Sequence, residues 1–181
     1  DADYNGVDSF TYTVTSGGKD ETHAISVTVK AANDAPTVVA PGSQALVAIL
    51  EDELGGNVGQ SVGGLVGAKL ADGADNQQPG GSVRNDLLGI AVVTNGSDAR
   101  GTWQYSTDGG NGWNPVGSAL VTAARTFNEA TLLRFKPAAN FNGAAPTLVV
   151  SLIEDSHVGT LTDNGALDVS VRGGTTAFST D

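Results

Sequence analysis

Oxygen-bearing side chains concentrate in an irregular stretch at residues 71–86, which reads ADGADNQQPGGSVRND. The candidate ligands among them are the carboxylate or amide oxygens of Asp72, Asp75, Asn76 and Asp86. Such oxygens are the ligands that calcium prefers, and Arg84 is the one cation in the stretch. Structureless loops of more than about 12 residues are uncommon in compact domains unless they have a function. We therefore expect this loop to hold calcium, with a metal-free loop as the alternative.

The stretch at residues 152–168, LIEDSHVGTLTDNGALD, is the second concentration of reactive side chains. Asp155 follows an apolar run and is a further candidate calcium ligand. Ser156 and His157 are adjacent, so in a strand they point to opposite faces and cannot act as nucleophile and base. The chain has two histidines and no cysteine, and it contains neither a G-x-S-x-G turn nor an H-E-x-x-H pair. We therefore expect no enzymatic activity.

The segment AANDAP at residues 31–36 is similar to the linkers of cadherins and cadherin-like bacterial repeats, in which Asn and Asp oxygens bind calcium between domains. Pro36 restricts Ala35 to an extended conformation, which suits a passage from strand to strand. Asp34 is the candidate ligand here, and Glu51, Asp52 and Glu53 follow closely enough to join it. A solvated linker without metal is the alternative.

The charge balance limits the classes of partner. The chain has 20 acidic and 9 basic residues, for a formal net charge of -11. Binding of nucleic acid or of an anionic membrane surface would require a basic face, so neither is expected. No segment has the roughly 18 consecutive apolar residues that membrane insertion requires. Without cysteine the chain has no disulfides, and bound calcium could take their place in stabilising a secreted fold.

Alternating apolar and polar residues predict an all-β fold. The runs SFTYTVTSG (residues 9–17) and HAISVTVKA (residues 23–31) are separated by a Gly-rich turn and predict a half-buried antiparallel hairpin. The runs LGIAVVTN, GTWQYST, TLLRFKP, PTLVVSLIE and LDVSVRG predict further strands, and their spacing is typical of a β-sandwich. One short helix is predicted over residues 61–70, capped by Ser61 and weakened by its glycines.

An internal repeat divides the chain. Tyr4-Asn5-Gly6 in DADYNGVDSFTYTV corresponds to Phe141-Asn142-Gly143 in AANFNGAAPTLVVS, 137 positions later. Residues 1–35 are therefore predicted to be the closing hairpin of one repeat together with its linker. Residues 36–181 are predicted to be the next repeat with its last strand truncated, so that the sequence is a window on a longer tandem array.

The string STDGGNGW (residues 106–113) matches the Asp-box pattern S-x-D-x-G-x-x-W of sialidase-like propellers. A propeller needs at least four copies and this chain has one, so we interpret it as a clasp that closes a hairpin. In that interpretation Asp108 accepts hydrogen bonds from turn amides, Gly109 and Gly110 take positive φ, and Trp113 packs on Trp103 or Tyr105.

Several strings together resemble the calcium-dependent tandem repeats of giant bacterial surface adhesins of the repeats-in-toxin (RTX) type. They are DYNGVDSFTYTVTSG with ISVTVKAANDAP, GIAVV with GTWQYSTDGGNGW, LLRFKPAANFNG, and GGTTAFST. The resemblance covers about two-thirds of the chain. It implies a secreted module at the bacterial cell surface, a monomer within its array, with a calcium-stabilised sandwich of the cadherin or immunoglobulin kind.

Two departures from the ordinary repeat indicate a role beyond spacing: the enlarged loop at residues 72–86, and LVVSLIEDSHV in place of an aromatic-rich strand. The resemblance implies calcium-dependent binding of peptide ends or sugars on a target cell. The residues expected to contact the ligand are Arg84, Asn85, Glu154, Ser156 and His157. A structural extender repeat and a carbohydrate-binding module are the alternatives.

Overall fold

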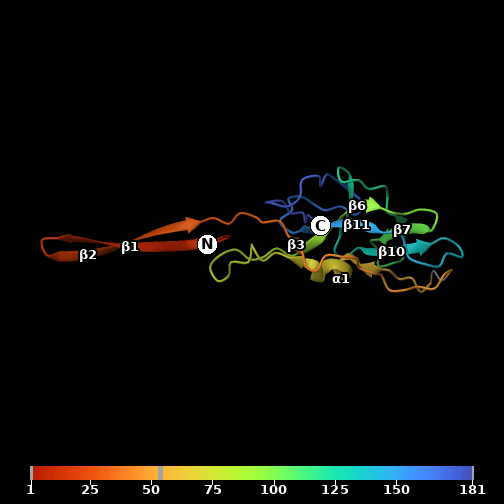
Figure 1. Ribbon diagram of the computed structural model, residues 1–181, viewed down its shortest axis with the longest axis horizontal. Helices are drawn as coiled ribbons and strands as arrows, with labels where there is room; N and C mark the ends of the chain where they lie inside the picture. Colours follow the sequence, from red (N-terminus) through yellow and green to blue (C-terminus); the bar gives the residue numbers. More distant parts are fainter. Residues whose placement is uncertain (1, 53–54, 181) are drawn as a thin grey trace.

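The computed structural model describes residues 2–52 and 55–180, and it is an all-β structure with one short helix, as predicted. Over those residues it contains twelve strands, the helix α1 (Val62–Val66) and the 3-10 helix η1 (Gly67–Lys69). No helix in that part of the chain is long and apolar enough to cross a membrane. The first two strands form a thin projection, and the others lie together at its base (Figure 1).

The projection is the predicted hairpin. Strands β1 (Gly6–Ser16) and β2 (Lys19–Val29) pair antiparallel along their whole length, and the turn falls at Gly17-Gly18, both with positive φ. Phe10 faces Ile25 across the pair, so the apolar residues share one face and the hydroxyl-bearing residues the other. The predicted half-burial is wrong for this chain, because Phe10 is 59% and Ile25 46% exposed and no other element covers them.

The remaining strands form two four-stranded sheets and a small ribbon. One sheet has the order β4 (Gln60–Ser61), β10 (Leu132–Pro137), β7 (Gly101–Ser106) and β8 (Asn114–Pro115). The other has the order β11 (Leu148–Glu154), β6 (Leu87–Asn95), β9 (Ala124–Asn128) and β12 (Ala166–Leu167). The strands β3 (Thr37–Val38) and β5 (Leu70–Ala71) pair separately.

Both sheets contribute to one hydrophobic core. Its buried members are Val62, Leu70, Ile90, Val92, Val116, Phe127, Leu133 and Leu152. Phe127 from β9 is fully buried and its ring lies 5.0 Å from that of Tyr105 on β7, so an aromatic contact joins the two sheets. A second cluster, which includes Ile153, Leu161 and Val169, joins β6, β9 and β11 to the segments on either side of β12.

The predicted helix forms over part of its range. Ser61 caps α1 as expected, since its Oγ accepts a hydrogen bond from the Gly64 amide at 3.1 Å. The α-helix ends after Val66 and the chain tightens into η1, so only a single turn of α-helix forms between the glycines.

Two strand assignments need correction. LDVSVRG was predicted to be a strand, but only Leu167 pairs, within β12, because Asp168 Oδ1 accepts the Ser170 amide in a local turn. The sequence ARTFN at β9 was not predicted, although it pairs with β6 and buries Phe127. Its alternation is short, and only its tertiary partners on both sides stabilise it.

The internal repeat is visible in the backbone. Asp3 and Asn140, which are equivalent in the two copies, have φ of 60° and 58°, and the equivalent Gly6 and Gly143 have φ of 129° and 131°. Left-handed conformations at a non-glycine residue are uncommon, so the same pair at the same spacing reflects one repeated turn. In both copies this turn leads into a strand, β1 in the first and β11 in the second.

Candidate cation site at the base of the hairpin

The linker after β2 is tied to three separate parts of the chain. The Asn33 side chain donates to Glu154 Oε1 at 2.8 Å, and the Asp34 amide donates to Asp75 Oδ2 at 3.0 Å. The Ala35 amide donates to the Gly174 carbonyl at 2.7 Å. These contacts bring together the end of β11 and the loop that follows β5, at the place where the hairpin leaves the rest of the molecule (Figure 1).

Three carboxyl groups are buried at this place. Asp72 and Asp75 are each 4% exposed, and Glu154 is fully buried at the last position of β11. Asp72 Oδ2 accepts the Asn85 amide, and Glu154 Oε1 accepts from Asn33 and from the Ser156 hydroxyl. The other oxygen of each of these two groups, Asp72 Oδ1 and Glu154 Oε2, is buried without a hydrogen-bond partner. Buried carboxyl oxygens normally have a hydrogen-bond partner, so two buried oxygens without one at the same place require an explanation.

Electrostatics at the cluster disfavour the charged forms. Burial raises the pKa of Asp75 above its ordinary value, and the Asp34 amide lowers it. The charge of Asp72, a hydrogen bond with the Asp72 side chain and the charge of Asp3 raise this pKa further. Burial likewise raises the pKa of Glu154, and the charges of Asp72 and Asp75 add to this effect. Desolvation and like charge therefore act together at one place, and a bound cation would relieve both.

No basic side chain neutralises these groups. Among the described residues the ion pairs join Arg84 to Asp86, Arg100 to Asp98 and His23 to Glu21, and none reaches Asp72, Asp75 or Glu154. The same residues contain no group of three Asp, Glu, His or Cys side chains already arranged around a single point as a finished metal centre. What is present is a set of buried carboxyl groups, two of which each have one oxygen without a hydrogen-bond partner.

Three further predicted calcium ligands, Asp155, Asp86 and Asn76, are exposed. Asp155 is exposed, and its Oδ1 accepts from the Asn85 side chain at 2.8 Å and from the Asp86 amide at 3.1 Å, so it lies at the edge of the cluster. Asp86 is paired with Arg84 at 3.4 Å, and Asn76 is exposed.

The acidic triplet does not join this cluster. Asp52 accepts the Asn140 amide at 3.1 Å and Glu51 accepts from the Asn142 side chain at 3.2 Å, in the loop that follows β10. They thus contact the second copy of the repeated turn rather than the linker. Glu53 lies outside the described residues.

The residues predicted to contact a ligand are close together but differ in accessibility. Arg84 and Asn85 lie in the loop beside Asp155, and the His157 ring packs at 5.6 Å from Phe178. Glu154 is fully buried, its Oε1 accepts hydrogen bonds from Asn33 and Ser156, and the charges of Asp72 and Asp75 act on its carboxyl group.

Sequence reasoning overlooked Asn33. Only Asp34 was taken from the motif Asn-Asp-Ala-Pro, yet it is the Asn33 side chain that reaches β11 and the Thr176 carbonyl, the latter at 3.3 Å. The motif itself was the available signal, since it places an amide and a carboxylate three and two positions before a proline.

Comparison with known proteins gives no assignment: no family model, curated protein or solved structure shows significant similarity to this chain.

Proposed function

We propose that this chain is a calcium-dependent adhesion module of a bacterial cell-surface protein, in which calcium binds at the base of the hairpin. The observation that carries the proposal is the pair of buried, unpartnered oxygens on Asp72 and Glu154, next to Asp75, in groups that none of the ion pairs among the described residues reaches. Calcium is the cation of choice because all the donors are hard oxygens. The Asp34 and Asp155 carboxylates complete the proposed donor set.

The proposed architecture is a calcium-stabilised β-sandwich of the cadherin or immunoglobulin kind, built from residues 36–181 and preceded by the hairpin of a neighbouring repeat. The shared core of the two four-stranded sheets supports the sandwich. The repeated left-handed turn at Asp3 and Asn140 supports the tandem arrangement, as does the uncovered apolar face of the hairpin. An isolated two-stranded hairpin is marginally stable in water, so this face needs a packing partner.

An extender role is the second candidate function, and the position of the cation site favours it. A cation between the linker and β11 would hold the hairpin and the following sheets in a fixed relative orientation, because its ligands come from both sides of the junction. Ligand recognition and stiffening are compatible in one module, and they are separated by whether the chain binds a soluble target.

Thermal unfolding with and without calcium tests the proposed site. At a calcium concentration 100 times the dissociation constant, one site adds about 2.7 kcal/mol to the free energy of unfolding. For a chain of this size that corresponds to a rise in Tm of about 5–10 °C. We expect Glu154→Gln to abolish the rise, because it removes one charge and one ligand oxygen from the buried cluster while preserving the shape of the side chain.

Asp168→Asn is the matched control, since Asp168 is a carboxylate in an exposed turn away from the junction. It should retain the full calcium response. Superimposable melts of the wild-type chain in calcium and in chelator would overturn the cation site. An equal loss of the response in both variants would show that the effect comes from overall charge.

A further inference from the structure

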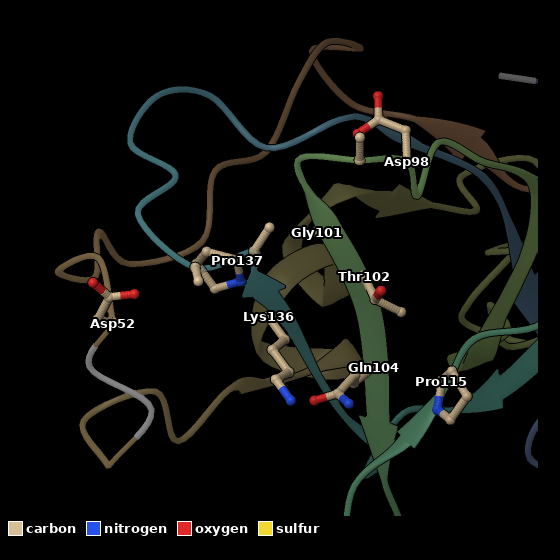
Figure 2. A pocket seen from close by; sticks show the side chains of 11 residues that line it. Asp52, Asp98, Gly101, Thr102, Gln104, Pro115, Lys136 and Pro137 are labelled. Carbon is tan, nitrogen blue, oxygen red and sulfur yellow. The ribbon is translucent and has the colours of Figure 1, made fainter.

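A cavity lies away from the cation site, on the sheet of β7, β8 and β10 (Figure 2). Its volume is about 580 Å³, within the range of small-ligand sites. Side chains alternate along a strand, and Trp103 and Phe135 pack together on the core side of β7 and β10. Thr102, Gln104 and Lys136 therefore point to the opposite face, where they form the floor of the cavity.

The strand register fixes this floor. Lys136 pairs with Thr102, and Gln104 lies between Arg134 on one side and Pro115 on the other. Figure 2 shows the side chains of Lys136 and Gln104 extending toward the same space. The hydrogen-bonding groups thus come from the interiors of neighbouring strands rather than from loops, which gives them defined positions.

Gln104 is held in one orientation. Arg134 Nε donates to Gln104 Oε1 at 3.0 Å, its Nη1 donates to the Asn57 carbonyl at 3.1 Å, and its guanidinium lies 3.9 Å from the centre of the Trp113 ring. Because the amide oxygen is occupied, the NH₂ group of Gln104 is the part left to serve a ligand. Sequence reasoning placed Trp113 on Trp103 or Tyr105. In the structure Trp113 contacts Arg134 instead, so the Asp-box turn that carries Trp113 helps to hold Arg134 and Gln104 in place.

The charged residues that line the cavity are Lys136, Asp52 and Asp98. Lys136 is exposed and takes part in none of the ion pairs found among the described residues. Asp98 at the rim is already paired with Arg100, at 2.7 Å. The floor therefore presents an ammonium and an amide NH₂, while Pro115 and Pro137 supply apolar walls. Asp52 lies at the edge opposite Pro115 and offers an acceptor there (Figure 2).

We propose that this cavity binds the free carboxylate of a small ligand, with Lys136 and Gln104 as the contacting groups. A charge-assisted hydrogen bond from the Lys136 ammonium, together with the oriented Gln104 amide, matches the two oxygens of a carboxylate. Asp52 then accepts a hydrogen bond from an N–H or O–H group farther along the same ligand. Both a peptide C-terminus and a uronic acid have this chemistry. The proposal deepens the ligand-binding part of the proposed function, but it uses no residue of the cation site.

Side-chain amide and lysine NMR signals provide a direct test. The probes are N-acetyl-tetraalanine as the free acid and as its C-terminal amide, and galacturonic acid with galactose as its neutral counterpart. We expect the signals of Gln104 and Lys136 to shift on titration with at least one of the two acids, and the neutral partner of that acid to have no effect. Which acid acts distinguishes a peptide source from a sugar source.

Lys136→Gln should weaken binding at least tenfold, because it removes the charge, whereas Lys19→Gln makes the same change at the tip of the hairpin and should leave binding unaltered. Absence of shifts with both acids up to about 10 mM, or equal shifts with the neutral compounds, would overturn the proposal. Running each titration in calcium and in chelator separates the two sites. Shifts that persist in chelator support the cavity even if the cation site fails, and an unchanged affinity of the Lys136→Gln variant overturns it.

Discussion

The side-chain amide of Asn33 donates a hydrogen bond of 2.8 Å to Glu154 Oε1, which joins the linker to the end of β11 across 121 positions of sequence. Glu154 is fully buried, the bond itself is partly buried, and the charges of Asp72 and Asp75 act on the Glu154 carboxyl group. The pair thus connects the orientation of the hairpin to the charge state of the buried cluster. A change at either residue should alter both.

Replacing Asn33 tests that connection. Asn33→Ala removes the bonds to Glu154 and to the Thr176 carbonyl, leaving a second Glu154 oxygen less well satisfied. We expect a loss of about 1–3 kcal/mol in the free energy of unfolding and faster tryptic cleavage at Lys30, next to the linker. Asn111→Ala, which removes one side-chain bond in an exposed turn, is the control and should leave cleavage at Lys30 unchanged. Equal cleavage in both variants would mean that Asn33 does not restrain the linker.

The stability of the calcium-free protein should fall as pH rises from the ordinary carboxyl pKa values toward neutrality. Asp75 and Glu154 have pKa values raised above 3.8 and 4.5, so between the unfolded and folded values the native state binds more protons than the unfolded state. Their protonated forms favour folding at low pH, and this contribution is lost as pH passes through the folded pKa values. Chelated protein should therefore melt at a higher temperature near about pH 5 than near about pH 7.5.

Glu154→Gln should flatten that pH dependence, since the amide does not titrate. Lowered pKa values are found for the carboxyls of Asp98, Asp108 and Asp168. Their contribution to the free energy of unfolding rises with pH, and it does so only at pH values below the ordinary aspartate pKa. Melting curves of both proteins in chelator across this pH range measure the difference. A wild-type Tm that rises steadily toward neutral pH would contradict the prediction.

Aromatic residues of the hairpin and of the core should respond very differently to truncation. Phe127→Ala removes a fully buried ring that contacts Tyr105 and should cost about 3–5 kcal/mol. Phe10→Ala affects a side chain that is 59% exposed. It should change the free energy of unfolding of the two four-stranded sheets by less than about 0.5 kcal/mol. Urea denaturation monitored by tryptophan fluorescence measures both effects, because Trp103 and Trp113 lie in the part of the chain that forms the two four-stranded sheets. A large effect of Phe10→Ala would show that the hairpin packs on a partner in solution.

Gly89 is predicted to be irreplaceable in β6. A β-carbon there would lie 2.2 Å from the Phe127 carbonyl oxygen and 2.7 Å from a Leu161 methyl group, so Gly89→Ala must displace the β6–β9 pairing. We expect a loss of roughly 3 kcal/mol or more, at the upper end of overpacking effects. Gly55→Ala, where a β-carbon would meet nothing within 4 Å, should be nearly neutral in the same denaturation experiment.

The sequence by itself determined the local features of this protein. Alternating residues such as Phe10, Tyr12 and Val14 are sufficient to predict strands, because the period of a strand is a local property. The Ser61 cap, the Asp108 clasp and the repeated Asn-Gly turn were also predictable, since each joins residues a few positions apart. The carboxylates of Asp72 and Asp75 could be named as candidate ligands from their spacing alone.

Only the tertiary structure decided which of these groups meet. Glu154 was expected to face a ligand, yet the position at which β11 ends buries it against a linker more than a hundred residues away. Glu51 and Asp52 were expected beside Asp34, and the fold instead places them on Asn142 and Asn140. The floor of the cavity depends on the register of β7 against β10, which pairs Lys136 with Thr102. Register and burial arise from packing among strands that are far apart in the sequence. This packing cannot be inferred from the spacing of polar residues along the chain.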